Sequence, residues 1–182
     1  LRFGDPGYVW YGGFIACLIV AVWYFRSRPE LDAWRYSDAF APAIMVGAAV
    51  GRTGCFLAGC CHGQPTDSWV GVVFPAHADL GPVHPTQLYD AAVGVGLGAL
   101  LLWRYPRRRF AGENITLLLM AYPVFRSLTE ALRGDAERGA VLGLSTSQWL
   151  SIPIFLVGLA LYVSQARTRA LAAKADEPLG AS

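Results

Sequence analysis

The chain has 182 residues, of which 54% are hydrophobic and only 15% are charged. A soluble domain typically carries about a quarter charged residues, so this composition excludes an ordinary soluble protein and indicates an integral membrane protein. The net charge of +2 is too small to indicate nucleic-acid binding, and we predict no nucleic-acid partner.

Long uncharged runs alternate with short basic patches, which is the pattern of membrane-spanning helices. Five runs are near the length needed to cross roughly 30 Å of hydrocarbon. They cover residues 9–25, 39–58, 85–103, 114–132 and 146–163. The predicted fold class is therefore all-α: a polytopic helical membrane protein, with about five transmembrane helices within residues 1–166.

Arginines gather after the first, third and fifth runs, whereas the connection at 59–83 holds neither Lys nor Arg. By the positive-inside rule, the N-terminus and this connection face outward and the C-terminus is cytoplasmic. The segment 167–182 is predicted to be a disordered tail. Because the chain opens without Met and without a signal-peptide pattern, we expect that its true beginning is missing.

Arg52 stands within the second apolar run, in Gly51-Arg52-Thr53-Gly54. A guanidinium costs about 2.5–3.5 kcal/mol at the centre of a bilayer and does not lose its proton. A chain keeps such a residue where it faces protein, water or an anionic ligand. Arg52 is therefore a candidate binding residue for an anion.

The fourth run places Tyr122, Arg126, Glu130 and Arg133 at helical spacing on one face. One interpretation is an internal Arg126–Glu130 ion pair that neutralises itself and joins helices. The other is that Arg126 and Arg52 converge on an anionic headgroup while Glu130 orients one of them. Counting charges favours the second, because three arginines against one glutamate leave surplus positive charge.

Two further motifs are open to both a structural and a functional interpretation. In His84-Pro85-Thr86-Gln87-Leu88-Tyr89-Asp90, His84 or Thr86 could cap a helix, and Gln87 and Tyr89 could hydrogen-bond a ligand or another helix. Near the start of the first run, adjacent glycines would let a ligand or a helix approach closely. They are Gly12 and Gly13, preceded by Tyr11.

Cys55, Cys60, Cys61 and His62 allow three interpretations: a metal site, apolar packing, or a reactive thiol whose pKa is lowered by Arg52. The separation of Cys55 and Cys60 suits a zinc-binding pair. No second Cys/His pair follows in another segment, however, so we predict no metal site.

Four ordered motifs resemble those of the bacterial prolipoprotein diacylglyceryl transferases, over about residues 8–163. They are Gly51-Arg52-x-Gly54 with Phe56 and Gly59, Gly63-x-Pro65-Thr66, His84 to Tyr89, and Tyr122 to Arg133. The resemblance implies a multi-pass enzyme of the bacterial inner membrane that uses no cofactor. Such enzymes transfer the diacylglyceryl group of phosphatidylglycerol to the lipobox cysteine thiol in a prolipoprotein signal peptide, releasing glycerol phosphate.

The resemblance also implies roles for single residues. Arg52 aligns with an arginine implicated in phosphatidylglycerol binding. The predicted catalytic residues are Arg126, Glu130, Tyr122, Tyr11 and His84, and the predicted substrate-binding residues are Arg52, Gly12, Gly13, Gln87, Tyr89, Cys55, Cys60 and Arg133.

The chain departs from the family pattern at three positions. Tyr11, Cys55 and Cys60 stand where the family has His, Asn and an acidic residue. A tyrosine, with a pKa of about 10, is a poor base at neutral pH. The base for the thiol is therefore unassigned among Tyr11, His62 and His84. Two alternatives stay open: a non-catalytic membrane protein that binds anionic phospholipid, and a thiol-dependent enzyme that uses Cys55, Cys60 and Cys61.

Overall fold

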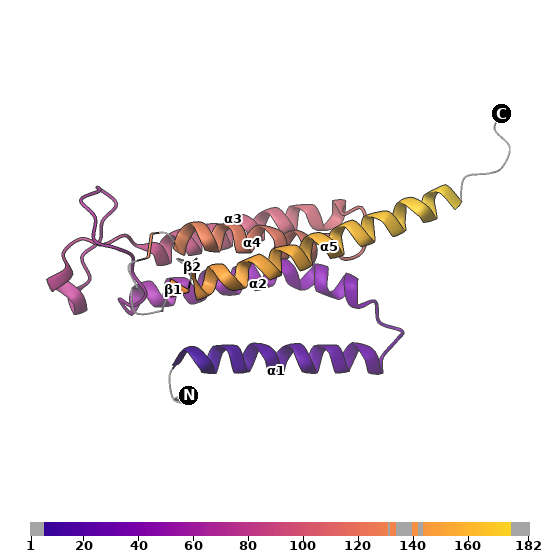
Figure 1. The fold of residues 1–182 in the computed structure, drawn as a ribbon, viewed down its shortest axis with the longest axis horizontal. Helices are drawn as coiled ribbons and strands as arrows, with labels where there is room; N and C mark the ends of the chain where they lie inside the picture. Colours follow the sequence, from indigo (N-terminus) through magenta and orange to yellow (C-terminus); the bar gives the residue numbers. More distant parts are fainter. Residues whose placement is uncertain (1–5, 131, 134–139, 142–143, 176–182) are drawn as a thin grey trace.

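The computed structural model describes residues 6–130, 132–133, 140–141 and 144–175 (Figure 1). Its α-helices are α1 (Pro6–Ser27), α2 (Ala33–Leu57), α3 (Thr86–Arg104), α4 (Glu113–Glu130) and α5 (Thr146–Ala175). Short 3-10 helices cover Pro75–Leu80 and Tyr105–Arg107, and β1 (Ala140–Val141) pairs antiparallel with β2 (Leu144–Ser145). Apart from this small hairpin and isolated β-bridges, the regular secondary structure of the described residues is helical, so the predicted fold class is confirmed.

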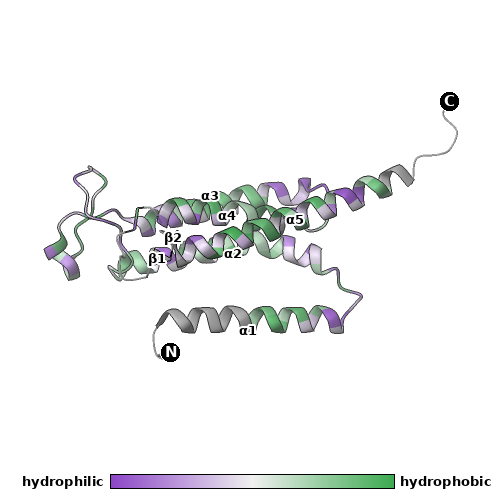
Figure 2. Cartoon of the chain, in the orientation of Figure 1, coloured by the Kyte–Doolittle hydropathy of each residue, from purple (hydrophilic) through white to green (hydrophobic). Residues whose placement is uncertain are grey.

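Three helices among the described residues are long and apolar enough to cross a membrane: Ala33–Leu57, Thr86–Arg107 and Ser147–Ala172. The 18 residues of α4 are not among them, and they include Glu113, Arg126 and Glu130. Hydrophobic residues predominate in the middle of α2, α3 and α5, and hydrophilic residues are more frequent toward the helix ends (Figure 2). The predicted count of about five crossings stays a prediction.

Small residues bring the helices together. A Cβ added at Gly94 of α3 would lie 3.0 Å from the Cβ of Ala49 on α2, and one at Gly158 of α5 would lie 2.8 Å from the Cβ of Leu119 on α4. Such close approach is typical of helix packing in membranes. The apolar core lies between α2, α3 and α4 and consists of Ala41, Met45, Leu97, Leu101 and Leu118.

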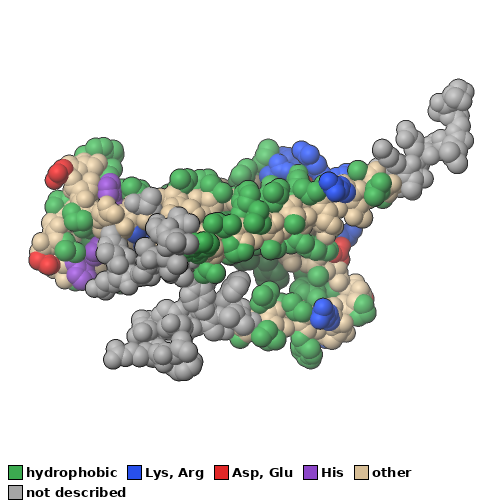
Figure 3. All heavy atoms as spheres, viewed as in Figure 1, with side chains coloured by type: hydrophobic (Ala, Val, Ile, Leu, Met, Phe, Trp, Pro, Cys, Tyr) green, Lys and Arg blue, Asp and Glu red, His purple; other side chains and the backbone are tan. Residues whose placement is uncertain are grey.

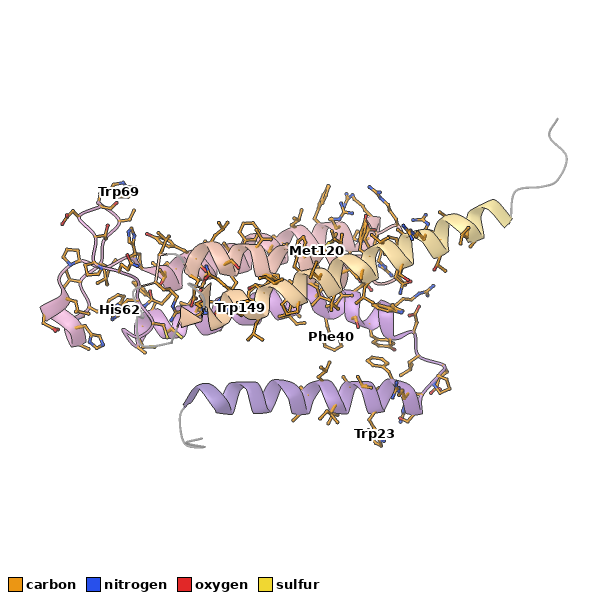
Figure 4. All side chains as sticks on the ribbon, in the orientation of Figure 1. Trp23, Phe40, His62, Trp69, Met120 and Trp149 are labelled. Atoms are coloured by element: carbon orange, nitrogen blue, oxygen red, sulfur yellow. The ribbon has the colours of Figure 1, made fainter. Side chains whose placement is uncertain are left out.

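Helix α1 runs beside the other four rather than among them (Figure 1). An apolar cavity of about 570 Å³ lies between α1 and α2 and is lined by Val20, Tyr24 and Phe40, among others. Phe40 points toward α1, whereas Trp23 points away from the bundle (Figure 4). Many large apolar side chains on the outer faces are exposed, as expected for helices surrounded by lipid.

Basic side chains gather at the end of the bundle where α3 ends and α4 begins (Figure 3). A buried carboxylate ties α2 to α4 there: Asp38 accepts hydrogen bonds from the backbone N–H groups of Gly112 (2.8 Å) and Ile115 (3.1 Å). Its Oδ2 also lies 3.5 Å from Nε of Arg108. These contacts fix the beginning of α4 against α2, and so fix where side chains further along α4 meet that helix.

Several helix ends differ from the sequence predictions. Helix α2 begins at Ala33, six residues before its predicted start, and α1 begins at Pro6, three residues before. Helix α5 continues to Ala175, so the predicted disordered tail is helical at 167–175, where the alanine-rich sequence favours helix. The rest of the tail, 176–182, lies outside the described residues. Helix α4 ends at Glu130, two residues before its predicted end.

Candidate functional site

Arg52 of α2 and Arg126 of α4 meet at the carboxylate of Asp90 on α3. Asp90 Oδ2 lies 3.1 Å from Arg52 Nε and 3.9 Å from Arg126 Nη1. The Arg126 and Asp90 side chains are each 11% exposed, and the Arg52 side chain is 24% exposed. The two arginines therefore converge as predicted, and they do so on a carboxylate of the protein itself.

The three charged side chains line a small cavity of about 20 Å³ together with Tyr122 and Phe125. A space of this size holds about one water molecule, so a lipid headgroup could enter only if side chains move. Tyr122 and Phe125 are 39% and 41% exposed. They are thus the lining residues best placed to move outward.

Arg126 also pairs with Glu130, at 2.6 Å between Nη2 and Oε2. The internal ion pair that formed the first interpretation of α4 is therefore present. Arg126 further donates weak hydrogen bonds to Thr129 Oγ1 (3.4 Å) and Ser147 Oγ (3.3 Å). Four groups from α4 and its neighbours thus hold this guanidinium.

The prediction of surplus positive charge is wrong for Arg52 and Arg126, because it omitted Asp90. Asp90 and Glu130 together match the two guanidiniums in charge. The sequence did contain the signal: Asp90 is the one acidic residue of the third apolar run, where an unpaired carboxylate is as unfavourable as an unpaired arginine.

The network is balanced in charge but incomplete in hydrogen bonds. Within the described residues, the buried oxygens Asp90 Oδ2 and Glu130 Oε2 lie at ion-pair distance from the arginines without a well-aligned hydrogen bond. Buried carboxylate oxygens without an aligned hydrogen bond are uncommon in proteins, since most buried polar atoms have at least one such partner. The guanidiniums can therefore turn some N–H donors toward a ligand without breaking well-formed hydrogen bonds to these two oxygens.

Arg133 does not continue the helical stripe of Tyr122, Arg126 and Glu130, because α4 ends at Glu130. It is buried and lies in an isolated β-bridge with Gly63. Its carbonyl accepts a hydrogen bond from Gln64 Nε2 at 3.2 Å. Arg133 is thus part of a junction between the loop after α4 and the connection from α2 to α3.

Three predicted site residues of the third run do not line the cavity. Gln87 is fully buried, and its Nε2 donates to the carbonyl of Cys60 at 2.7 Å. His84 Nδ1 and the Tyr89 hydroxyl contact each other at 3.2 Å. In this structure Gln87 holds the cysteine-containing loop in place, and its predicted role in substrate binding stays a prediction.

Tyr11, Gly12 and Gly13 lie in α1, and their side chains are outside the described part of the chain. Their predicted roles stay predictions. His62, another candidate base, lies in the connection after α2 (Figure 4), where its ring stacks on Phe74 and lies 5.2 Å from that of His77.

Cys55, Cys60 and Cys61 come together because the chain reverses where α2 ends. The N–H of Cys60 donates to the carbonyl of Cys55 at 3.1 Å, and Gly59 supplies the positive φ (69°) of the reversal. Partial burial, followed by the neighbouring Cys61 and Cys55, raises the pKa of Cys60 to about 11. The third interpretation of the cysteines, a thiol whose pKa is lowered by Arg52, is therefore wrong for Cys60, whose thiol stays protonated at neutral pH.

Gly63 lies where three segments cross. A Cβ there would come within 2.6 Å of the Leu132 carbonyl oxygen and 2.8 Å of side-chain atoms of His84 and Thr86. We expect Gly63→Ala to lower the free energy of unfolding by about 1–3 kcal/mol, the usual cost of overpacking. Gly54→Ala is the control, because a Cβ at Gly54 meets nothing within 4 Å. Thermal unfolding in detergent compares the two, and equal midpoints would contradict the crowding.

Comparison with known proteins adds to this geometry. A family model described as prolipoprotein diacylglyceryl transferase matches residues 1–164. A relative from Bordetella parapertussis, named phosphatidylglycerol–prolipoprotein diacylglyceryl transferase, is 40% identical over 166 residues, which are 90% of this chain and 63% of the relative. A relative of the same name from Clostridium tetani is 35% identical over 160 residues, 86% of this chain and 63% of the relative. The chain thus spans less than two thirds of the length of these relatives.

Proposed function

The chain belongs to the prolipoprotein diacylglyceryl transferase family, and from this premise we propose that it holds the anion-binding core of an enzyme transferring diacylglyceryl from phosphatidylglycerol to a prolipoprotein thiol. The single observation that carries the proposal is the meeting of Arg52 and Arg126 at one cavity between α2, α3 and α4. Guanidinium forks suit phosphate oxygens, which can accept two N–H bonds from each.

In the proposed reaction the headgroup phosphate replaces part of the contact between the arginines and Asp90. The acceptor thiol gives its proton to a base, for which Tyr11, His62 and His84 are the candidates. Its sulfur forms a bond to the glyceryl carbon while the bond from that carbon to the phosphate oxygen breaks. The leaving glycerol phosphate takes the electron pair, and the guanidiniums stabilise the charge that develops on its oxygen. Glu130 keeps Arg126 in position throughout, as its 2.6 Å contact suggests.

The lipid would enter sideways from the bilayer. Tyr122 and Phe125 line the cavity and are partly exposed, so they can part to admit the headgroup. We place the protein in the bacterial inner membrane as a multi-pass protein, with the connection at 59–85 outside and the basic end in the cytoplasm, by the positive-inside rule. The acceptor is the lipobox cysteine of a prolipoprotein signal peptide, reaching the site from the outer side.

A non-catalytic phospholipid-binding protein is the second candidate. The observation that favours it is the charge balance of the network, in which Asp90 and Glu130 neutralise Arg52 and Arg126 and could hold the fold together without turnover. The thiol-dependent enzyme is less favoured, because the raised pKa of Cys60 leaves little thiolate at neutral pH.

Complementation separates the two candidates. The protein is expressed from its complete gene in a strain depleted of its own transferase, and lipoprotein modification is measured by mass spectrometry. We expect diacylglyceryl-modified lipoprotein and restored growth. Normal membrane insertion without any modification would reject the transferase and leave the lipid-binding protein.

A further inference from the structure

Three thiols near the end of α2 lie close enough together to bind a single metal ion. The Sγ atoms of Cys55, Cys60 and Cys61 all lie within 4.8 Å of one another, and all three cysteines are free. In a tetrahedral thiolate site, a Zn–S bond of about 2.3 Å places sulfur atoms about 3.8 Å apart. Side-chain rotations that move the sulfur atoms by about 1 Å would therefore bring them to the separation of a metal site.

Hydrogen bonds from another helix hold the loop that carries Cys60 and Cys61 in this conformation. Gln87 Nε2 donates to the Cys60 carbonyl at 2.7 Å, and Thr86 Oγ1 donates to the Cys61 carbonyl at 3.0 Å. Cys61 has a φ of 63°, which residues with a side chain rarely adopt. Both hydrogen bonds come from the start of α3, and such imposed backbone conformations concentrate at functional sites.

We propose that Cys55, Cys60 and Cys61 form a binding site for one thiophilic cation of the Zn²⁺ class, with a fourth coordination position left open. The sequence argued against metal because the chain offers no second Cys/His pair in another segment, but the reversal after α2 lets a single segment supply three ligands. Three protein ligands and one open position are the arrangement of catalytic rather than structural zinc sites. Cys60 is exposed, so the open position is accessible from outside.

The site adjoins the arginine network. Cys55 follows Arg52 by three residues on α2, a spacing that puts the Cβ atoms about 5–6 Å apart on one helix face. On α3, Gln87, which holds the Cys60 carbonyl, precedes Asp90 by three residues in the same way. On α2 the Cys55 thiol and the Arg52 guanidinium thus belong to positions one helical turn apart, and on α3 one turn separates the residue that holds the cysteine loop from the residue that pairs with the arginines.

This neighbourhood suggests what occupies the fourth position, an inference that rests on the proposed function. The acceptor thiol would bind the cation as a thiolate and release its proton to water, since cations of this class bind the deprotonated thiol. The cation would thus supply a thiolate whose lone pair can form the bond to the glyceryl carbon, while the bond from that carbon to the phosphate oxygen breaks and glycerol phosphate takes the electron pair. This would supply the activation of the thiol in a chain that has Tyr11 where the family has a histidine base.

The metal site is tested on the protein from its complete gene, reduced, stripped with chelator under argon and placed in lipid nanodiscs. Titration with Zn²⁺ should give one bound equivalent. Cys55→Ser and Cys61→Ser should each weaken Zn²⁺ binding by at least about 100-fold, the upper end of what loss of an outer-shell partner costs. Cys17→Ser, in α1, is the matched control and should bind as the wild type does. Binding below one equivalent, binding retained by both variants, or a disulfide among the three cysteines in the isolated protein would overturn the site.

The fourth position is tested with Co²⁺ in place of Zn²⁺, because thiolate ligands give Co²⁺ a charge-transfer absorption. A lipobox peptide with its cysteine should increase that absorption, whereas the same peptide with serine should not. Equal spectra with both peptides would overturn the acceptor role and leave the metal site intact. The proposed function fails separately if the protein binds one Zn²⁺ but lipoprotein is not modified in the complementation assay.

Discussion

Replacing Arg126 with Gln is expected to lower the rate of diacylglyceryl transfer by about 100- to 1,000-fold, the usual loss when one donor to a developing negative charge is removed. Arg126 is the better held of the two arginines, since Asp90, Glu130, Thr129 and Ser147 all contact it. Once the phosphate has replaced the contact with Asp90, the remaining contacts hold this guanidinium in position for the charge that develops. Transfer is measured in membranes with labelled phosphatidylglycerol and a lipobox peptide.

Two further variants show whether the effect of Arg126→Gln is specific. Arg126→Lys keeps the charge but loses the planar fork, so we expect activity between that of Gln and wild type. Arg169→Gln changes an exposed arginine of α5 and should leave the rate unchanged. Wild-type activity in Arg126→Gln, at normal protein levels, would refute the role given to Arg126.

Asp90→Ala is expected to lower the free energy of unfolding by about 3–5 kcal/mol, the usual cost of removing one partner from a buried ion pair. Among the described residues, the change removes the carboxylate that pairs with Arg52 and leaves Arg126 with Glu130. Two positive charges would then face one carboxylate in a site where the arginines are mostly buried. Unfolding by denaturant in detergent micelles measures the loss.

Asp90 acts on the reaction through the arginines, so its positioning role needs a readout beyond stability. Asp90→Glu restores the charge, and we expect it to recover most of the stability and part of the transfer rate. Asp67→Ala removes an exposed carboxylate of the α2–α3 connection and serves as the control. If Asp90→Ala were as stable as Asp67→Ala, Asp90 would not be holding the arginines together.

The sequence predicted the helices well because apolar runs of membrane length leave few alternatives. It also predicted that Arg52 and Arg126 converge, since a guanidinium in an apolar run must find a polar partner. The partner was missed: the cost argument was applied to the arginines and not to Asp90, although Asp90 stands in an equally apolar run. Treating every intramembrane charge alike would have identified it.

Other features depend on contacts that spacing does not encode. The tight reversal after α2 brings Cys61 beside Cys55, and it depends on hydrogen bonds from Thr86 and Gln87, more than twenty residues later. The early end of α4 removes Arg133 from the helical stripe and joins it to Gly63. In the second case tertiary contacts override a helical pattern that continues in the sequence.

The central claim is that Arg52 and Arg126 hold a lipid phosphate, and native mass spectrometry of lipid binding tests it most directly. Phosphatidylglycerol is compared with diacylglycerol, which has the same chains and no phosphate. Hydrogen bonds to charged groups contribute about 1.5–3 kcal/mol each, so we predict at least about tenfold weaker phosphatidylglycerol binding in the Arg52→Gln, Arg126→Gln double variant, with diacylglycerol binding unchanged. Equal phosphatidylglycerol binding by the double variant and the wild type would contradict the account.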